Sequence, residues 1–243
     1  MDHPQLPRRP AKGLRRRRKQ LGKYFPGSRL ATRIEAIPDL GLVYVRNPKV
    51  ASTTLLAWLD WMTTGNLREG NYPVRRESTL PQPGDVGWDR VMRMVDGEAF
   101  RFSFVRDPVT RFESAYRNKI QQPKSQPRQV LEILGRPDDA TTKVSFEDFL
   151  WAVEQQEPLV MDLHWRPQHL NLMHPVFTFD MLGRLERFDE DIEEIRRRLD
   201  LPSPPTRSRN ASRAAGPSVY DGRPDLVERV RALYARDCEL YGY

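Results

Sequence analysis

The chain has 243 residues, 38% of them hydrophobic and 30% charged, which is enough apolar material for a globular core. Lysine and arginine number 40 against 33 acidic residues, and the net charge of +7 favours anionic partners such as nucleotides, anionic glycans or nucleic acids. The single cysteine, Cys238, excludes an intrachain disulfide and favours a reducing compartment. Because no apolar stretch is long enough for a signal peptide or a spanning helix, we expect no integral membrane segment.

Basic residues are dense in the first 28 residues, which include the run Arg15 to Arg18. A segment with many like charges is typical of a disordered, solvated arm. We therefore expect a basic disordered arm without catalytic role over residues 1–28, with a dedicated nucleic-acid or membrane contact as the alternative, and a single domain over residues 29–243.

Two segments of the chain share the order strand, loop, helix. The apolar run Leu42 to Val45 predicts a buried strand, and leucines at helical spacing predict a helix over residues 55–62. The same order returns with a predicted strand over residues 100–105 and a helix that begins near Pro108. Two such units predict an α/β fold with a P-loop-like central parallel β-sheet flanked by helices.

The remaining elements follow from local patterns. Gly, Pro and charge over residues 65–90 predict a long irregular connection, and Ser145 with Asp148 predicts a capping box at a helix start. Beyond these lie a predicted strand at 176–181, an amphipathic helix at 189–199, a loop or lid at 202–222 and a final helix from Pro224 to about Leu240.

The loop after the first strand has the features of an anion site. It reads Asn47-Pro48-Lys49-Val50-Ala51-Ser52-Thr53-Thr54 and runs directly into a helix. Free backbone N–H groups and the positive end of the helix dipole stabilise a phosphate there, and Lys49 can neutralise charge on a leaving oxygen. The glycines of a Walker A loop are missing, which disfavours an ordinary NTPase. A plain N-capped helix is the alternative interpretation.

A second anion site is expected where the second strand ends. Arg106 follows that strand at its carboxyl end, where ligands of open α/β sheets collect. Arg111 and Ser114 follow on the next helix, and an Arg with a Ser can hold a phosphate through charge-assisted hydrogen bonds. Two such sites fit a ligand with two separated anionic groups, whereas an Arg-rich surface helix is the alternative.

On these residues the sequence resembles the PAPS-dependent sulfotransferases, in particular the family-2 carbohydrate group that includes the chondroitin and dermatan sulfotransferases. The resemblance spans about residues 40 to 243 in family order. The matching segments are Pro48 to Thr53, Val105 to Pro108 with Arg111, Ser114, Ala115 and Tyr116, then His164-Trp165-Arg166-Pro167-Gln168, and the ending Tyr234, Asp237, Leu240, Gly242 and Tyr243.

The resemblance implies transfer of a sulfuryl group from 3'-phosphoadenosine 5'-phosphosulfate (PAPS) to a hydroxyl acceptor, with a glycan as the expected acceptor, adenosine 3',5'-bisphosphate as product and no metal. It implies that the 3'-phosphate is bound by Arg106 and Ser114. Arg209 lies in the late loop, where a lid would cover the nucleotide, with a disordered loop as the alternative. The residues implied for the 5' end are Pro48, Lys49, Ala51, Ser52, Thr53 and Thr54.

Sulfuryl transfer needs a base for the acceptor proton. His164 has the best context of the four histidines, although a packing role is equally open, and Glu77 is the second candidate. The residues expected to contact the acceptor are Arg75, Arg76, Lys119 and Trp165.

Two other classes of protein stay open. A kinase-like P-loop phosphotransferase would need magnesium and a glycine-rich loop, and a basic nucleic-acid-binding protein would need a basic face interleaved with aromatic residues. We expect no nucleic-acid partner, because the charges outside the tail are scattered. Lumenal members of the family usually carry a membrane anchor and several cysteines, so their absence here favours a cytoplasmic, bacterial protein. The sequence predicts neither the identity of the acceptor nor an oligomeric state.

Overall fold

The computed structural model describes residues 11–25, 27–65, 79–121, 127–139, 141–202 and 216–243. The chain divides into two compact units: the first holds residues 1–105 and 170–209, and the second holds residues 106–169 and 210–243.

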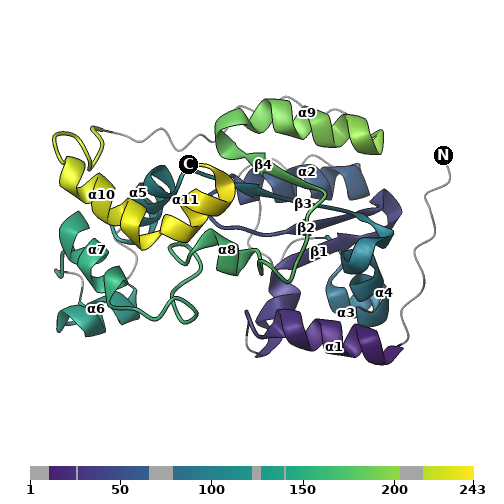
Figure 1. The fold of residues 1–243 in the computed structure, drawn as a ribbon, viewed down its shortest axis with the longest axis horizontal. Coiled ribbons are helices and arrows are strands. Elements are labelled where there is room, and N and C mark those ends of the chain that lie inside the picture. The colour runs from purple at the N-terminus through teal and green to yellow at the C-terminus, as the bar shows by residue number, and fades with distance from the viewer. Residues whose placement is uncertain (1–10, 26, 66–78, 122–126, 140, 203–215) are drawn as a thin grey trace. The chain divides into compact units, whose positions relative to one another are not determined.

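The first unit is built on a four-stranded sheet in the order β1-β2-β3-β4 (Figure 1). Strands β2 (Leu42–Val45), β3 (Phe100–Val105) and β4 (Met181–Arg184) are parallel neighbours, and the predicted strands at 42–45 and 100–105 are confirmed. Strand β1 (Ile34–Ile37) is antiparallel to β2 because a tight turn at Gly41, with φ of 62°, reverses the chain between them. The sheet is therefore mixed rather than purely parallel.

Alternate side chains of the strands place aromatic rings on one face of this sheet. Tyr44, Phe102 and Phe104 pack there against helices α2 (Ser52–Thr64) and α9 (Phe188–Leu199), which confirms both predicted helices. Figure 1 shows α9 on one side of the sheet and helices α1 (Ala11–Gly22), α3 (Pro83–Val86) and α4 (Trp88–Arg93) on the other.

The basic N-terminal segment differs from its prediction. Residues 11–22 form helix α1, and Leu14, Leu21 and Phe25 are buried. The guanidinium of Arg18 lies 3.8 Å from the centre of the Trp88 ring, a cation–π contact. The expected disordered arm over residues 1–28 is therefore an integral part of the first unit from residue 11 to 25, because a few apolar residues among the arginines give the helix a buried side.

Two other segments of the first unit also differ from their predictions. The connection expected to be irregular contains α3 and α4, since Gln82 and Asp85 form a capping box and Pro83 occupies the first helical turn. Strand β4 begins where the predicted strand at 176–181 ends. Asp180 accepts hydrogen bonds of 2.8 Å from the backbone and guanidinium of Arg101 and fixes that start.

The second unit is helical over its described residues. Phe112, Phe149, Trp165 and Tyr234 are fully buried at its core. Its helices are α5 (Pro108–Lys119), α6 (Arg128–Leu134), α7 (Phe146–Glu154), α10 (Pro224–Leu233) and α11 (Ala235–Tyr241), and the short helix α8 (Gln168–Asn171) begins in it.

Two local predictions can be compared with these helices. The capping box at the start of α7 is confirmed, because Ser145 Oγ accepts a hydrogen bond of 3.0 Å from the backbone N–H of Asp148. The predicted final helix is instead two helices, since Tyr234 has a non-helical backbone with φ of −110° and ψ of 26°.

Gly183 is the position of the sheet at which a side chain should be least tolerated. A Cβ atom there would lie 2.5 Å from Phe104 Cε1, on a ring that is fully buried. We expect Gly183→Ala to lower the free energy of unfolding by about 1–3 kcal/mol, as overpacking of a rigid core does. Urea denaturation measures this loss. Gly84→Ala, where the added methyl group meets open space, is the control and should change stability by less than about 0.5 kcal/mol. Equal effects at both glycines would contradict this account.

Candidate functional site

The loop after β2 is tied to the end of the neighbouring strand. Asn47 is fully buried, and its Nδ2 donates to the carbonyl of Phe104 at 3.0 Å. The carboxamide of Asn171 donates in turn to Asn47 Oδ1 at 3.4 Å. Asn47 thus fixes the point from which the candidate anion loop leaves the sheet, a role that its position in the sequence did not reveal.

The backbone of this loop is held in unusual conformations. Lys49 and Ala51 have φ values of 70° and 60°, in the left-handed region that costs an L-residue roughly 1–2 kcal/mol. Strained residues of this kind cluster at ligand sites. Val50 between them is fully buried and anchors the turn.

The helix that follows the loop has no side-chain cap at its start. Ala51 is the N-cap residue of α2 and makes no side-chain cap hydrogen bond. Ser52, which could have capped the helix, donates its hydroxyl to the carbonyl of Asn47 instead. Thr53 is exposed, whereas Lys49 and Thr54 are half-buried. The first turn of α2 therefore presents N–H groups and the positive end of the helix dipole beside a lysine, which suits an anion.

The second candidate element starts at Arg106, the residue directly after β3 and the first of the second unit. Asp107 caps α5 by accepting a hydrogen bond of 2.8 Å from the backbone N–H of Thr110. The guanidinium of Arg106 donates to the hydroxyl of Thr110 at 3.0 Å. Ser114 lies one helical turn beyond Thr110 on the same side of α5, so Arg106, Thr110 and Ser114 form one strip. Sequence analysis did not identify Thr110.

Arg111 does not project toward a ligand as its spacing suggested. Its side chain is buried and donates to the carbonyl oxygens of Arg166 at 3.0 Å and Leu163 at 3.2 Å. Burial lowers the pKa of this guanidinium, and the negative charge of Asp237 opposes that effect. Arg111 therefore holds the segment of residues 163–169, which we call the 160s segment.

Trp165 and His164, both in the 160s segment, differ strongly in exposure. Trp165 is fully buried, and its Nε1 donates to Gln156 Oε1 at 3.1 Å. The prediction that Trp165 contacts an acceptor is wrong, because its ring is buried and packs edge-to-face against Phe149. His164 keeps 31% of its side chain exposed, and its Nδ1 lies 2.6 Å from Asp162 Oδ1. Burial raises the pKa of Asp162, but the hydrogen bond and charge of His164 outweigh it, and the net pKa is lowered.

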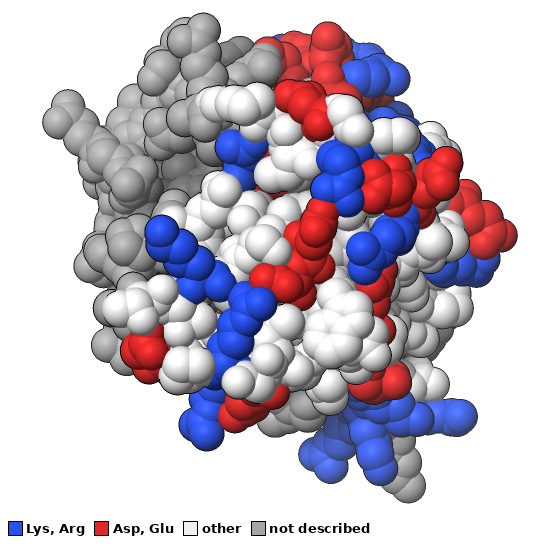
Figure 2. Space-filling model, turned by 90° about the vertical axis from the view of Figure 1, so that its left-hand side faces the viewer, with Lys and Arg blue, Asp and Glu red and all other residues white. Residues whose placement is uncertain are grey.

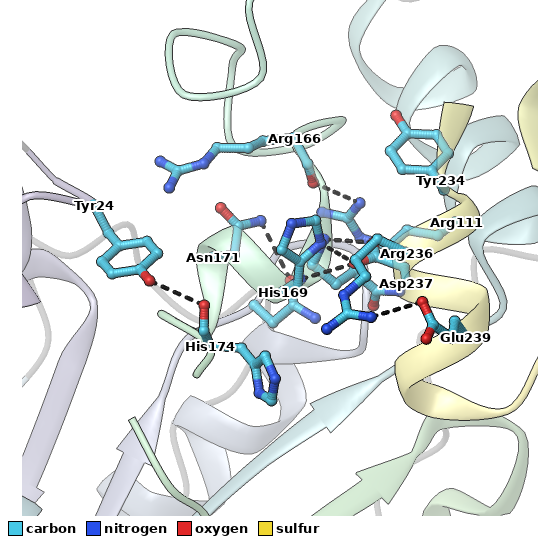
Figure 3. A network of polar contacts seen from close by, with 12 residues as sticks. Tyr24, Arg111, Arg166, His169, Asn171, His174, Tyr234, Arg236, Asp237 and Glu239 are labelled. Atoms are coloured by element: carbon cyan, nitrogen blue, oxygen red, sulfur yellow. Dashed lines mark hydrogen bonds and ion pairs between the residues drawn. The ribbon is translucent and has the colours of Figure 1, made fainter. Parts of the chain in front are cut away.

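A second histidine–aspartate pair lies in the same unit (Figure 3). His169 Nδ1 lies 2.7 Å from Asp237 Oδ1, and the Asp237 side chain has no exposed surface. The other Asp237 oxygen accepts the backbone N–H of Gln168 at 2.6 Å. Sequence analysis assigned no role to His169, because its partner lies 68 residues away in the chain.

Several predicted residues lie outside the described part of the chain: Arg75, Arg76, Glu77 and Arg209. Of the others, the first unit brings together the residues from Pro48 to Thr54, and the second brings together Arg106 and Ser114. Lys119, at the end of α5, is half-buried, and its charge helps to lower the pKa of Asp162. Among the described residues, no group of three or more His, Cys, Asp or Glu side chains could hold a metal ion.

Comparison with known proteins identifies the class. A model of the sulfotransferase family matches residues 33–243, through both units of the structure. This chain belongs to the sulfotransferase family. It is similar to carbohydrate sulfotransferase 14 of mouse, with 34% identity over 103 residues, which are 40% of this chain and 27% of the relative. It is also similar to carbohydrate sulfotransferase 12 of Xenopus laevis, with 25% identity over 247 residues, which are 84% of this chain and 58% of the relative.

The chain therefore spans less than two thirds of the curated relatives it matches. No solved structure gives a significant match. The expectation of a bacterial cytoplasmic protein is contradicted by these relatives, which are eukaryotic carbohydrate sulfotransferases from mouse, human, frog and zebrafish. In the part of the chain that the structure describes, no helix has the length and apolar character needed to cross a membrane.

The role of Arg111 as an anchor of the 160s segment predicts a large loss on its removal. Arg111→Met keeps much of the volume of the side chain. It removes the donors to two carbonyl groups and the positive charge that acts on the buried Asp237, so we expect a loss of about 3–5 kcal/mol in the free energy of unfolding. The control is Arg128→Met, at a side chain that is 83% exposed and paired with Glu132, where we expect a loss of less than about 0.5 kcal/mol. Chemical denaturation compares the two, and a loss below about 1 kcal/mol for Arg111→Met would exclude the anchor role.

Proposed function

We propose that this chain transfers a sulfuryl group from PAPS to a hydroxyl group of a carbohydrate. The observation that carries the proposal is the uncapped start of α2 beside Lys49, directly after a parallel strand, in a chain of the sulfotransferase family. The carbohydrate acceptor is inferred from the relatives, which are named carbohydrate sulfotransferases.

The residues of this chain suit the two charged ends of PAPS. The N–H groups at the start of α2, with Lys49 and the hydroxyl of Thr53, are suited to the 5'-phosphosulfate. The strip of Arg106, Thr110 and Ser114 is suited to the 3'-phosphate, since a guanidinium and two hydroxyls give charge-assisted and neutral hydrogen bonds. We assign the first group to the 5' end and the second to the 3' end.

The proposed reaction is an in-line displacement at sulfur. The acceptor oxygen forms a bond to sulfur while the bond between sulfur and the bridging oxygen breaks, and the electron pair of that bond stays on the 5'-phosphate. Lys49 and the N–H groups of α2 stabilise the growing negative charge there. A base takes the proton of the acceptor hydroxyl.

His164 is the proposed base, with Glu77 as the second candidate. The Nδ1 of His164 is engaged by Asp162 at 2.6 Å, so the ring is oriented and its Nε2 is the nitrogen that would take the proton. A positioning role for His164 within the 160s segment remains the alternative. Arg75, Arg76 and Lys119 are proposed to contact an acidic acceptor.

The other two classes of function fit these observations less well. A kinase-like phosphotransferase is disfavoured by the family match and by the missing glycines of the loop. Figure 2 shows positive and negative side chains interspersed on one face of the molecule rather than a continuous basic surface. Helices of the second unit pair arginines with acids, for example Arg117 with Glu113 and Arg229 with Glu154, which disfavours nucleic-acid binding on those helices.

The donor site is tested by calorimetric titration of adenosine 3',5'-bisphosphate with EDTA present. We expect binding by the parent protein, and binding weaker by about 10- to 100-fold in Lys49→Ala and in Arg106→Ala, since a charged hydrogen bond contributes about 1.5–3 kcal/mol. The matched controls are Lys23→Ala and Arg128→Ala, at exposed residues that belong to neither element. Absence of binding by the folded parent, or equal effects in variants and controls, would refute the proposed donor site.

The base is tested by the rate of sulfate transfer to an oligosaccharide acceptor. If His164 is the base, His164→Ala should lower kcat by about 10²- to 10⁴-fold and leave the affinity for adenosine 3',5'-bisphosphate unchanged. Glu77→Gln provides the comparison, because the same pattern at Glu77 alone would move the base to that residue. A loss of nucleotide affinity in His164→Ala would assign His164 a positioning role instead.

A further inference from the structure

We infer that Gln168, held by the buried carboxylate of Asp237, positions Arg106 for the 3'-phosphate, so that Gln168 is a positioning residue for nucleotide binding. This inference rests on the proposed function and gives the His164-Trp165-Arg166-Pro167-Gln168 motif a physical role. All the contacts on which it depends lie within the second unit.

The first step is the contact between Gln168 and Arg106. The side-chain amide of Gln168 makes two hydrogen bonds with the backbone of Arg106: Oε1 accepts its N–H at 3.1 Å, and Nε2 donates to its carbonyl at 2.8 Å. Gln168 has no exposed surface. One amide therefore satisfies both backbone groups of the residue that follows β3 and fixes its orientation, as a neighbouring strand would.

The second step is the contact between Gln168 and Asp237. The backbone N–H of Gln168 donates to Asp237 Oδ2 at 2.6 Å, and the N–H of His169 donates to Oδ1 at 2.9 Å. With His169 Nδ1 at 2.7 Å, the carboxylate accepts three hydrogen bonds from adjacent groups. A buried carboxylate is stable only while such donors stay in place, so Asp237 holds the backbone of Gln168 in one position.

The third step is the side chain of Arg106. Its Nε donates to the hydroxyl of Thr110 at 3.0 Å, which directs the guanidinium along the first turn of α5 toward the side that carries Ser114. With its backbone fixed by Gln168 and its side chain by Thr110, Arg106 is ordered before a ligand arrives. Preorganisation of this kind raises affinity because less conformational freedom is lost on binding.

A double-mutant cycle tests the inference, with adenosine 3',5'-bisphosphate as the probe. Gln168→Met keeps the size of the side chain and removes both hydrogen bonds to Arg106. We expect it to weaken binding by about tenfold, the equivalent of about 1.4 kcal/mol. In the Arg106→Ala background, the same change should weaken binding by less than twofold, because the residue through which Gln168 acts has lost its guanidinium.

Gln156→Met is the matched control. Gln156 holds the same segment by accepting the hydrogen bond of Trp165 Nε1 at 3.1 Å, but the contacts described for it do not involve Arg106. It should lower stability and leave nucleotide affinity unchanged. Equal losses of affinity in Gln156→Met and Gln168→Met would mean that general loosening of the segment is the cause, and the inference would be overturned.

The remaining outcomes separate this inference from the proposed function. If Gln168→Met does not fold, Gln168→Asn replaces it, because it keeps a neutral amide in the buried site but, being one methylene shorter, no longer reaches the backbone of Arg106. Its weakening of binding should again disappear with Arg106→Ala. Equal weakening with and without Arg106 would overturn the role of Gln168 while the donor site stands. A parent protein that does not bind the nucleotide would overturn both.

Discussion

The parallel pairing of β2 with β3 is the constraint on which the first unit depends. Because the two strands run in the same direction, both end at one edge of the sheet, and the chain after each strand begins there. Two buried side chains strengthen this edge: Ser103 donates to the carbonyl of Val45 at 2.7 Å, and Asn47 donates to that of Phe104 at 3.0 Å. Firm strand ends allow Lys49 and Ala51 to keep left-handed backbone conformations that a free loop would relax.

The second unit depends on two buried charges of opposite sign. Arg111 donates to two backbone carbonyls of the 160s segment, and Asp237 accepts from two of its backbone N–H groups. A buried charge is costly unless its hydrogen bonds are complete, and replacing such a pair by apolar residues can even stabilise a protein. The effect of these charges is therefore conformational: any displacement of the segment leaves Arg111 or Asp237 without its partners, so the segment has one favoured position.

Local pattern was sufficient for the strands at 42–45 and 100–105 and for the capping box at Ser145, since each depends on neighbouring residues. Local pattern failed where residues far apart in the chain determine whether a side chain is buried. Trp165 is buried by a core that includes Tyr234, 69 residues further along the chain, whose hydroxyl donates to its carbonyl. Local pattern did not predict helix α1, because its arginines outnumber the few apolar residues that are buried. The strand, loop and helix around residues 42–64 are contiguous in the chain, so local pattern was sufficient for their order as well, and the anion-binding role of the loop stays a prediction.

The two histidine–aspartate pairs differ in the burial of their carboxylates. Asp162 is 44% exposed and lies only two residues from His164 in the chain. Asp237 is fully buried and bonded to Gln168 as well, so a movement of His169 would disturb the residue that contacts Arg106. On the proposed function, proton transfer at His169 would therefore be coupled to the contacts of Gln168 with Arg106, whereas none of the contacts described for His164 involves Gln168 or Arg106. This difference is a reason to propose His164 rather than His169 as the base.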